Sequence, residues 1–121
     1  MSPPWQNPQQ GEIHYIHLNP TKGYEIRKTR PALVISSDDA GILPIRLVVP
    51  ITGWNASYEG KFWLVPVQPT SRNGLKKSSA IDVMQTRAVS VSPERFAAKL
   101  GNVEAETLEQ VKAALCLVID V

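Results

Sequence analysis

Residues 19–36, NPTKGYEIRKTRPALVIS, join a cation-rich turn directly to an apolar strand. One carboxylate, Glu25, stands in this stretch against four cations, which are Lys22, Arg27, Lys28 and Arg30. Such a local excess of positive charge suits a ligand that carries phosphate groups. The strand that follows should fix Arg30 in place, whereas the other three cations lie in the turn. We therefore expect one positioned cation and three that gather the ligand, the alternative being a charged turn that is simply solvated.

The chain has 121 residues, the size of one domain, and can bury about two thirds of the surface that its unfolded form exposes. Its single cysteine, Cys116, excludes an internal disulfide, and the surrounding apolar helical run predicts a buried free thiol in a reducing, cytosolic setting. The longest apolar runs fall well short of the ~20 residues that cross a bilayer, and no signal-like segment opens the chain. We expect a soluble cytoplasmic protein.

The net charge is only +2, but the charges are unevenly distributed along the chain. Residues 1–91 carry ten Lys or Arg against six Asp or Glu, whereas residues 102–121 carry Lys112 alone against four acids. A basic body with an acidic tail would let a polyanion dock on one face, although surfaces of mixed sign are also ordinary in soluble proteins.

Two segments differ in composition. Residues 1–10 hold three prolines and three glutamines without a period, which indicates a flexible arm whose Trp5 packs over a neighbouring surface. Residues 11–121 then form a single domain. Its first part contains short β-branched runs that predict at least five strands, namely EIHYIHL, PALVIS, IRLVVPIT, FWLVPVQ and SAIDVMQTRAVSV. Pro50 and Pro66 fall inside such runs, which places an edge, a bulge or a bend at each point, as in a small sheet that curls into a barrel.

Two helix signals follow the strands. Ser92, Pro93 and Glu94 supply an N-cap, a first-turn proline and an acidic first turn for a short helix that ends near Gly101. A second helix is predicted by apolar residues at i, i+3, i+7 and i+10, which are Leu108, Val111, Leu115 and Val118. Its start is defined only to within a turn, because Glu104 stands where Ser or Asp would be expected.

Taken in order, five pieces of the chain form a recognisable set: GEIHYIHLNPTKGYE, TRPALVIS, VVPIT, IDVMQTRAVS, and KLG followed by the final helix. From Gly11 to Val121 the chain resembles the MazF/PemK (Kid) toxins of bacterial toxin–antitoxin systems. The resemblance implies a mainly β fold with α, a small SH3-like barrel of the CcdB/MazF type with a short helix and a C-terminal helix, which forms a symmetric homodimer. It further implies an endoribonuclease that cuts single-stranded RNA at short sequences without a metal or other cofactor, and that a cognate antitoxin neutralises.

The same resemblance assigns roles to particular positions. Arg30 of TRPAL matches the catalytic arginine of the family, and Thr52 of VPIT matches its catalytic threonine. Glu25 matches an acidic loop position that contacts RNA in relatives. Gln85 and Arg87 match the Q-x-R that follows the barrel strand, and are expected to bind RNA or to support the site.

Three departures decide between branches of the family. The PemK-like branch has a catalytic aspartate immediately before that glutamine, where this chain has Met84. The loop histidine of that branch aligns with Tyr24, and Asn19 replaces the usual aspartate before Pro-Thr. The chain therefore resembles the arginine–threonine, MazF-like branch.

RNA supplies its own nucleophile, the 2′-hydroxyl, so cleavage needs alignment, help with a proton, and cations for the charge that builds on phosphorus. Arg30 can supply that charge through a fork of donors, and its permanent protonation favours a stabilising role over that of a base. Thr52 would orient the 2′-hydroxyl or the phosphate. The products would be a 2′,3′-cyclic phosphate and a 5′-hydroxyl.

Aromatic residues beside cations suggest where RNA would lie. Tyr24 belongs to the basic turn, whose Lys22, Arg27 and Lys28 would gather the strand, and Trp54 follows Thr52 by two residues. Either ring could instead belong to the core. A second basic loop, with Arg72, Lys76 and Lys77, is a candidate phosphate track or a solvated loop.

Other chemistries are less well supported. His14 and His17 are three residues apart on a predicted strand, so they point to opposite faces and cannot jointly flank a phosphate. Asp38 and Asp39 are typical of a turn rather than a metal site. Two further hypotheses stay open: a non-catalytic toxin of the same fold that poisons a protein such as DNA gyrase, as the related CcdB toxins do, and a plain SH3-like binding module.

Overall fold

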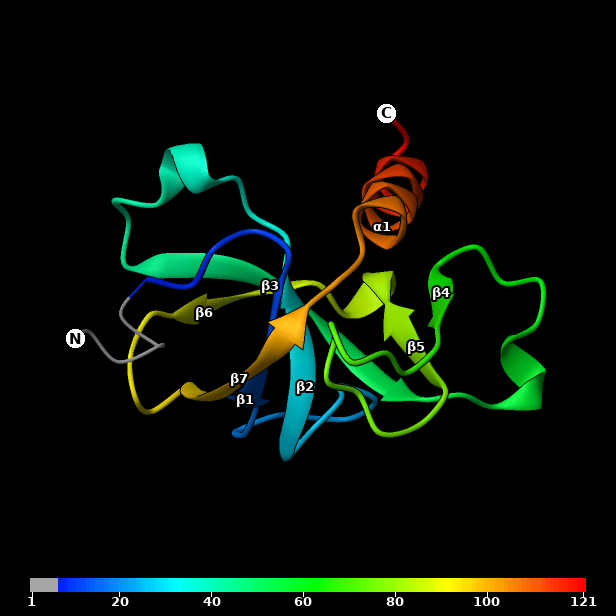
Figure 1. Cartoon of the computed structure of the whole chain (residues 1–121), viewed down its shortest axis with the longest axis horizontal. Coiled ribbons are helices and arrows are strands. Elements are labelled where there is room, and N and C mark those ends of the chain that lie inside the picture. The colour runs from blue at the N-terminus through cyan, green and yellow to red at the C-terminus, as the bar shows by residue number, and fades with distance from the viewer. Residues whose placement is uncertain (1–6) are drawn as a thin grey trace.

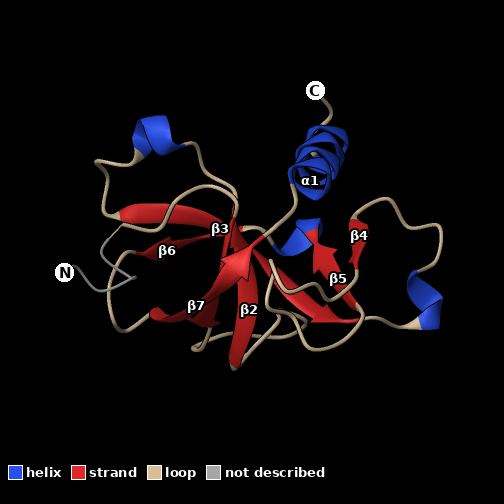
Figure 2. Ribbon diagram, in the orientation of Figure 1, coloured by secondary structure: helices blue, strands red, loops and turns tan. Residues whose placement is uncertain are grey.

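The computed structural model describes residues 7–121, so the sequence-based interpretation of Trp5 lies outside the described residues. Residues 7–121 form seven strands and one α-helix (Figures 1 and 2). Their bounds are β1 (Glu12–His17), β2 (Thr29–Val34), β3 (Ile45–Gly53), β4 (Leu64–Val67), β5 (Ser79–Asp82), β6 (Arg87–Ser90), β7 (Phe96–Asn102) and α1 (Ala105–Val118). Three short 3-10 turns, η2 (Asp38–Ala40), η3 (Ala56–Tyr58) and η4 (Val83–Gln85), lie between them.

The strands form one antiparallel sheet in the order β4-β5-β3-β2-β1-β7, and β6 pairs with β3 off this path. This arrangement confirms the predicted mainly β class with a C-terminal helix. Within residues 7–121 the pairings do not close the sheet into a complete barrel, because β4 and β7 end the path without pairing with each other.

Strand β3 is shared between two parts of the sheet. β6 pairs with its first half, Ile45 to Val48, and β5 pairs with its last three residues, Ile51 to Gly53. Pro50 falls in the gap between the two partners, as expected for a residue that lacks an N–H. Pro66 lies in β4, which is an edge strand. Each proline therefore lies where the regular pairing of the sheet is interrupted or ends, as the sequence predicted.

Two predictions of secondary structure were wrong. The run SAIDVMQTRAVSV is not one strand, because the 3-10 turn η4 divides it into β5 and β6, which pair with different halves of β3. The short helix expected from Ser92 to about Gly101 is only a turn, in which Arg95 and Phe96 donate to the Ser92 carbonyl. The chain then enters β7, because pairing with β1 and burial of Phe96 outweigh the local helix signal.

The apolar core has two parts, one on each face of the central strands. Ile13, Leu33 and Val49 belong to the larger part, whereas the alternate residues Ile16 and Val48 belong to the smaller one. The two-residue period of a strand explains this division, since neighbours along β1, β2 and β3 point in opposite directions.

Helix α1 covers the larger core. The four predicted contact residues, Leu108, Val111, Leu115 and Val118, all pack against it, which confirms the predicted face. Cys116 is exposed, so the prediction of a buried thiol was wrong. It is offset by two residues from the buried Ala114 and therefore lies on another side of the helix. Across residues 7–121, no helix has both the length and the apolar character needed to cross a bilayer.

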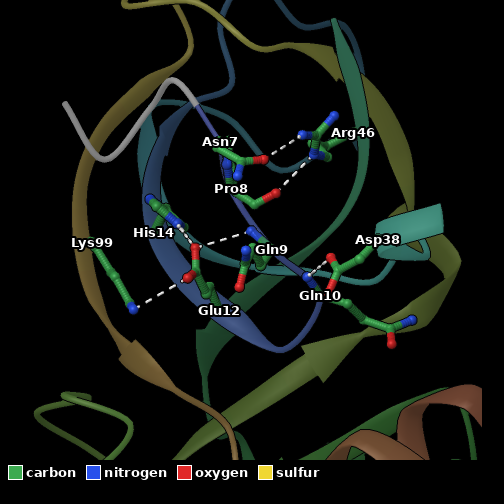
Figure 3. Close-up of polar contacts among 9 residues, drawn as sticks. All are labelled: Asn7, Pro8, Gln9, Gln10, Glu12, His14, Asp38, Arg46 and Lys99. Atoms are coloured by element: carbon green, nitrogen blue, oxygen red, sulfur yellow. Dashed lines mark hydrogen bonds and ion pairs between the residues drawn. The ribbon is translucent and has the colours of Figure 1, made fainter. Parts of the chain in front are cut away.

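The described start of the chain is held by side chains of the body (Figure 3). Arg46 is 4% exposed, and its Nε donates to the Pro8 carbonyl at 2.8 Å. Other donors of Arg46 reach Asn7 Oδ1 and the carbonyls of Gly41, Leu43 and Ile45. This buried cation is satisfied by oxygen acceptors, and it ties residues 7–8 to the loop that precedes β3.

Candidate functional site

Arg30 and Thr52 come from neighbouring strands. The β2–β3 ladder runs Val34 with Val48, Leu33 with Val49 and Ala32 with Pro50. Arg30 and Thr52 lie just beyond the last pair of this ladder, where Arg30 pairs with Ile16 of β1 and Thr52 pairs with Ala80 of β5. Both residues line one pocket of about 330 Å³, which we call the β2–β3 pocket.

The β2–β3 pocket is basic and rich in hydroxyl groups. None of the residues among 7–121 that line it is acidic. Its cations are Arg30, Lys76 and Lys77, and its hydroxyl groups come from Tyr15, Thr29, Thr52 and Ser79. Such a pocket can hold a phosphate group and can donate several hydrogen bonds to it.

Arg30 keeps most of its donors available. Its only side-chain hydrogen bond within residues 7–121 runs from Nε to the Arg27 carbonyl at 3.3 Å. Arg30 is half-buried, and none of the ion pairs in the described chain involves it. Its remaining N–H groups can therefore turn to an anion in the pocket.

The loop between β1 and β2 has its own internal bonds. Glu25 Oε1 accepts from the Lys22 N–H at 2.7 Å, and Asn19 Oδ1 accepts from the Lys28 N–H at 3.2 Å. Lys28 has a positive φ of 72°, a conformation that the loop imposes on a side-chain-bearing residue. The Glu25 carboxylate thus closes a turn, and Lys22, Arg27 and Lys28 are each left close to solvent.

Gln85 and Arg87 hold this loop against the body. Gln85 Oε1 accepts from the Ile26 N–H at 3.1 Å, and its Nε2 donates to the Tyr24 carbonyl at 3.0 Å. Arg87 Nη1 donates to the Leu18 carbonyl at 3.0 Å. These contacts bring residues that are about sixty positions apart to the two sides of a second pocket, the loop pocket. Its polar side chains are Thr21, Lys22, Glu25, Gln85, Thr86 and Arg87.

The two aromatic candidates lie apart from both pockets. Tyr24 is fully exposed at the tip of the loop. Trp54 is half-buried and lines a third, aromatic pocket between the β3–β4 loop and α1, where its ring meets Tyr58 edge-to-face at 5.8 Å. The structure therefore groups Arg30 with Thr52, and Lys22 and Glu25 with Gln85 and Arg87, but it places Trp54 beyond the end of β3.

Two positions decide whether the chain has a carboxylate that could act as the acid or base of the PemK-like branch. Met84, at the position of the PemK-branch aspartate, is exposed on the loop pocket. Asp82, two residues earlier, is part-buried and lines none of the three pockets. Burial raises the pKa of the Asp82 carboxyl, and its Oδ1 has no hydrogen-bond partner in the described chain. Asp82 therefore does not take the place of the missing aspartate, and Glu25 is the carboxylate that lines the loop pocket.

The histidines are separated as their spacing predicted. His14 is 1% exposed and meets Phe96 edge-to-face, whereas the half-exposed His17 contacts Thr29 Oγ1 through Nδ1. His14 Nε2 lies 2.9 Å from Glu12 Oε1, and Lys99 Nζ lies 3.2 Å from Glu12 Oε2 (Figure 3). Burial lowers the pKa of His14 although the nearby Glu12 opposes this effect. Neither histidine lies beside Arg30 in the β2–β3 pocket.

Sequence reasoning missed part of the β2–β3 pocket. It treated Lys76 and Lys77 as a separate phosphate track, and it did not consider Tyr15 or Ser79. The pairing of Gly53 with Ser79 brings this loop to the end of β3, and no local pattern encodes that pairing.

A small curled antiparallel sheet with a basic, hydroxyl-lined pocket defines a domain suited to binding a polyanion. The chain belongs to the family of PemK-like, MazF-like toxins of type II toxin–antitoxin systems, whose sequence pattern it matches over residues 9–119. It is 33% identical over 118 residues to a Mycobacterium tuberculosis protein named endoribonuclease MazF9, a match that covers 93% of this chain and 96% of that protein.

Solved structures share the fold. The crystal structure of MazF from Deinococcus radiodurans has a TM-score of 0.78 at 22% identity, and the match covers 95% of this chain and 98% of that one. A mycobacterial endoribonuclease in complex with its cognate antitoxin has a TM-score of 0.73 at 15% identity, and that match covers 94% and 96%. The family and fold expected from the sequence are thereby confirmed.

Proposed function

We propose that this chain is the toxin of a type II toxin–antitoxin system and acts as a sequence-selective, metal-independent endoribonuclease on single-stranded RNA. Family membership and a relative named as an endoribonuclease support the activity. The observation that carries the proposal is the convergence of Arg30 and Thr52 on a pocket whose lining contains no acidic residue among residues 7–121.

In the proposed reaction the 2′-oxygen forms a bond to phosphorus while the bond from phosphorus to the 5′-oxygen breaks. The proton of the 2′-hydroxyl passes to water, water returns a proton to the 5′-oxygen, and the products are a 2′,3′-cyclic phosphate and a 5′-hydroxyl. Arg30 binds the phosphate oxygens and stabilises the added negative charge. Thr52 orients the 2′-hydroxyl or the phosphate through its own hydroxyl group. Because the nucleophile belongs to the substrate, these roles require no metal.

The loop pocket would receive the RNA backbone beside the reacting phosphate. Lys22, Arg27 and Lys28 supply positive charge, and the exposed Tyr24 ring is available for a base to stack upon. Gln85 and Arg87 support this surface, because their side chains hold the loop backbone.

Glu25 and Trp54 complete the proposed RNA surface. One Glu25 oxygen closes the loop turn, and its other oxygen can accept from a base. Trp54 would receive a base further along the strand, since it follows the pocket residue Thr52 by two positions on the same chain segment. This continuity suggests a strand of RNA that passes from the loop pocket to the aromatic pocket.

A protein antitoxin and a second copy of the chain are the proposed partners. A mycobacterial relative was solved with its cognate antitoxin, and a basic groove suits an acidic or apolar peptide tail. For the homodimer we propose the first half of β3, where Ile45 and Leu47 are 50% and 43% exposed. Val49 and Ile51 lie on the same face of β3 and are buried in the core. A second copy of the chain would bury the exposed Ile45 and Leu47 in the same way. The toxin would act in the cytoplasm, where messenger RNA is available.

Cleavage of a mixed-sequence RNA in EDTA tests the activity. Wild-type protein should produce 5′-hydroxyl ends at a short recurring sequence, and Arg30→Ala should abolish cleavage while its thermal unfolding stays unchanged. A variant that cuts as fast as wild type would remove Arg30 from the mechanism. Inhibition of gyrase supercoiling without RNA cleavage would instead support the non-catalytic toxin, and equal binding of RNA and a 2′-deoxy control without turnover would support a binding module.

A further inference from the structure

We propose that Lys77 is a further catalytic residue, which contacts the phosphate at the scissile bond from the side of the β2–β3 pocket opposite Arg30's strand. The inference rests on the proposed endoribonuclease function and assigns a residue to it. The sequence alone indicated this lysine only as part of a second basic loop. The structure places it in the lining of the pocket that Arg30 and Thr52 share.

The Lys77 side chain crosses Gly53, the residue that follows Thr52. A methyl group at Gly53 would meet Lys77 Nζ at 3.1 Å and Lys77 Cε at 3.2 Å. The ammonium group thus occupies the space that any other residue at position 53 would fill. Thr52, Gly53 and Lys77 all line the β2–β3 pocket, so the Lys77 side chain borders the same cavity as the threonine that would orient the reacting group.

The backbone around Lys77 is held on both sides. The Trp54 N–H donates to the Ser78 carbonyl at 3.0 Å, and Ser79 Oγ donates to the Lys77 carbonyl at 2.8 Å. Ser79 also pairs with Gly53 in the β3–β5 ladder. Lys77 therefore starts from a fixed point, and only its flexible stem has to be ordered on binding.

The preceding loop is anchored as well. Asn73 is fully buried, and its side chain bonds the Thr70 and Leu75 N–H groups and the Gln68 carbonyl. Gly101 lets this loop approach β7, because a methyl group at Gly101 would collide with the Arg72 carbonyl oxygen. The loop that carries Lys77 is consequently part of the folded body.

The charge of Lys77 is available to a ligand. Ion pairs within residues 7–121 do not include Lys77, and no acid lines its pocket. In the transition state the phosphoryl group gains a second negative charge. A second cation opposite Arg30 would therefore stabilise the transition state more than it stabilises the bound substrate. Bound RNA would displace water and strengthen the attraction. Lys76 lines the same pocket, but only Lys77 is placed against the β3 backbone.

Single-turnover cleavage at saturating enzyme, with affinity for a 2′-deoxy analogue measured separately, tests the assignment. Lys77→Gln should slow cleavage about 10²-fold with a much smaller change in affinity, and Lys77→Arg should recover most of the rate. Lys112→Gln, the same charge change on the outer side of α1, should leave the rate unchanged. An unchanged rate in Lys77→Gln, or a loss confined to affinity, would overturn the proposal. Absence of cleavage by wild-type protein would instead refute the proposed function.

Gly53→Ala provides a second variant that keeps the charge. The added methyl should shift the ammonium group by a few tenths of an ångström, since the far end of a lysine moves easily, and should slow cleavage less than Lys77→Gln does. The double variant Gly53→Ala/Lys77→Gln should then be little slower than Lys77→Gln alone, because both changes act on one interaction. Additive losses would show that Gly53 acts independently and would count against the contact.

Discussion

Arg30 and Thr52 line one pocket from neighbouring strands, and each is held in a ladder, Arg30 with Ile16 of β1 and Thr52 with Ala80 of β5. Their relative position is thus set by strand pairing rather than by a loop. A pair that is held in this way needs little reorganisation when substrate binds, which is the condition under which fixed donors stabilise a transition state best. The flexible cations of the β1–β2 loop can then vary without disturbing the reacting groups.

Thr52→Val should reduce the single-turnover rate by about 10²-fold while the fold is retained, because the change removes the hydroxyl group and keeps the β-branched shape. Thr52→Ser restores the hydroxyl and should recover most of the rate. Rapid-quench cleavage with enzyme in excess measures this effect, and circular dichroism checks the fold. If valine and serine variants cleave equally fast, the hydroxyl group has no part in the reaction.

Gln85→Leu should loosen the loop between β1 and β2, since it removes both the acceptor for the Ile26 N–H and the donor to the Tyr24 carbonyl. We expect a stability loss of about 1–2 kcal/mol. We also expect faster trypsin cleavage at Lys22, Arg27 or Lys28 and weaker binding of RNA. Limited proteolysis followed by mass spectrometry locates the cuts.

Arg72→Gln is the matched control for trypsin, because it changes a protease site on a different, exposed loop. Cleavage within residues 22–28 should be the same in this variant as in wild type. Equal protease resistance of Gln85→Leu would mean that other contacts, such as that of Arg87 with the Leu18 carbonyl, suffice to hold the loop.

The sequence predicted the structure correctly where a short repeat of apolar residues determines which face of a strand or helix is buried. The alternation of β1 to β3 and the spacing of Leu108 and Val118 identify buried faces without knowledge of the partners. It failed at Phe96, where a good helix start was followed by a segment that β1 could pair with, and at Lys77, which reaches its pocket through a ladder between distant segments. Both failures concern non-local pairing, which local propensity does not encode.

Leu47→Glu should shift the homodimer towards monomer, because it places a charge on the exposed apolar half of β3. Sedimentation velocity at micromolar concentration measures the change, and the thermal stability of the monomer should be little affected. Phe62→Glu, a similar change at a half-exposed residue beyond the other end of β3, should stay dimeric. Dimers of unchanged affinity in Leu47→Glu would place the interface elsewhere.

Acidification should destabilise the fold through His14. Because burial lowers its pKa below the ordinary 6.5, the folded state binds fewer protons than the unfolded chain in this range. The contribution of neutral His14 to the stability of the fold is complete above pH 6.5, and it is lost as the pH falls from there towards the lowered pKa of His14. Urea unfolding from about pH 7.5 to about pH 5.5 should show a decline that approaches ~1.4 kcal/mol per pH unit.

His14→Gln removes the titrating group and keeps a donor for Glu12, so the decline above about pH 5.5 should disappear even if the variant is less stable at every pH. His17→Gln is the matched control and should retain the wild-type slope.

The measurement stops at about pH 5.5 because, in stronger acid, the protonation of two carboxyls changes the stability of the fold in opposite directions. Burial opposes ionisation of Glu12, but hydrogen bonds from His14, Gln9 and Lys99 outweigh it and lower its pKa, so its stabilisation is lost below pH 4.5. Burial raises the pKa of Asp82, whose protonation in acid favours the folded state. A His14→Gln variant that keeps the full slope would assign the acid sensitivity to another group.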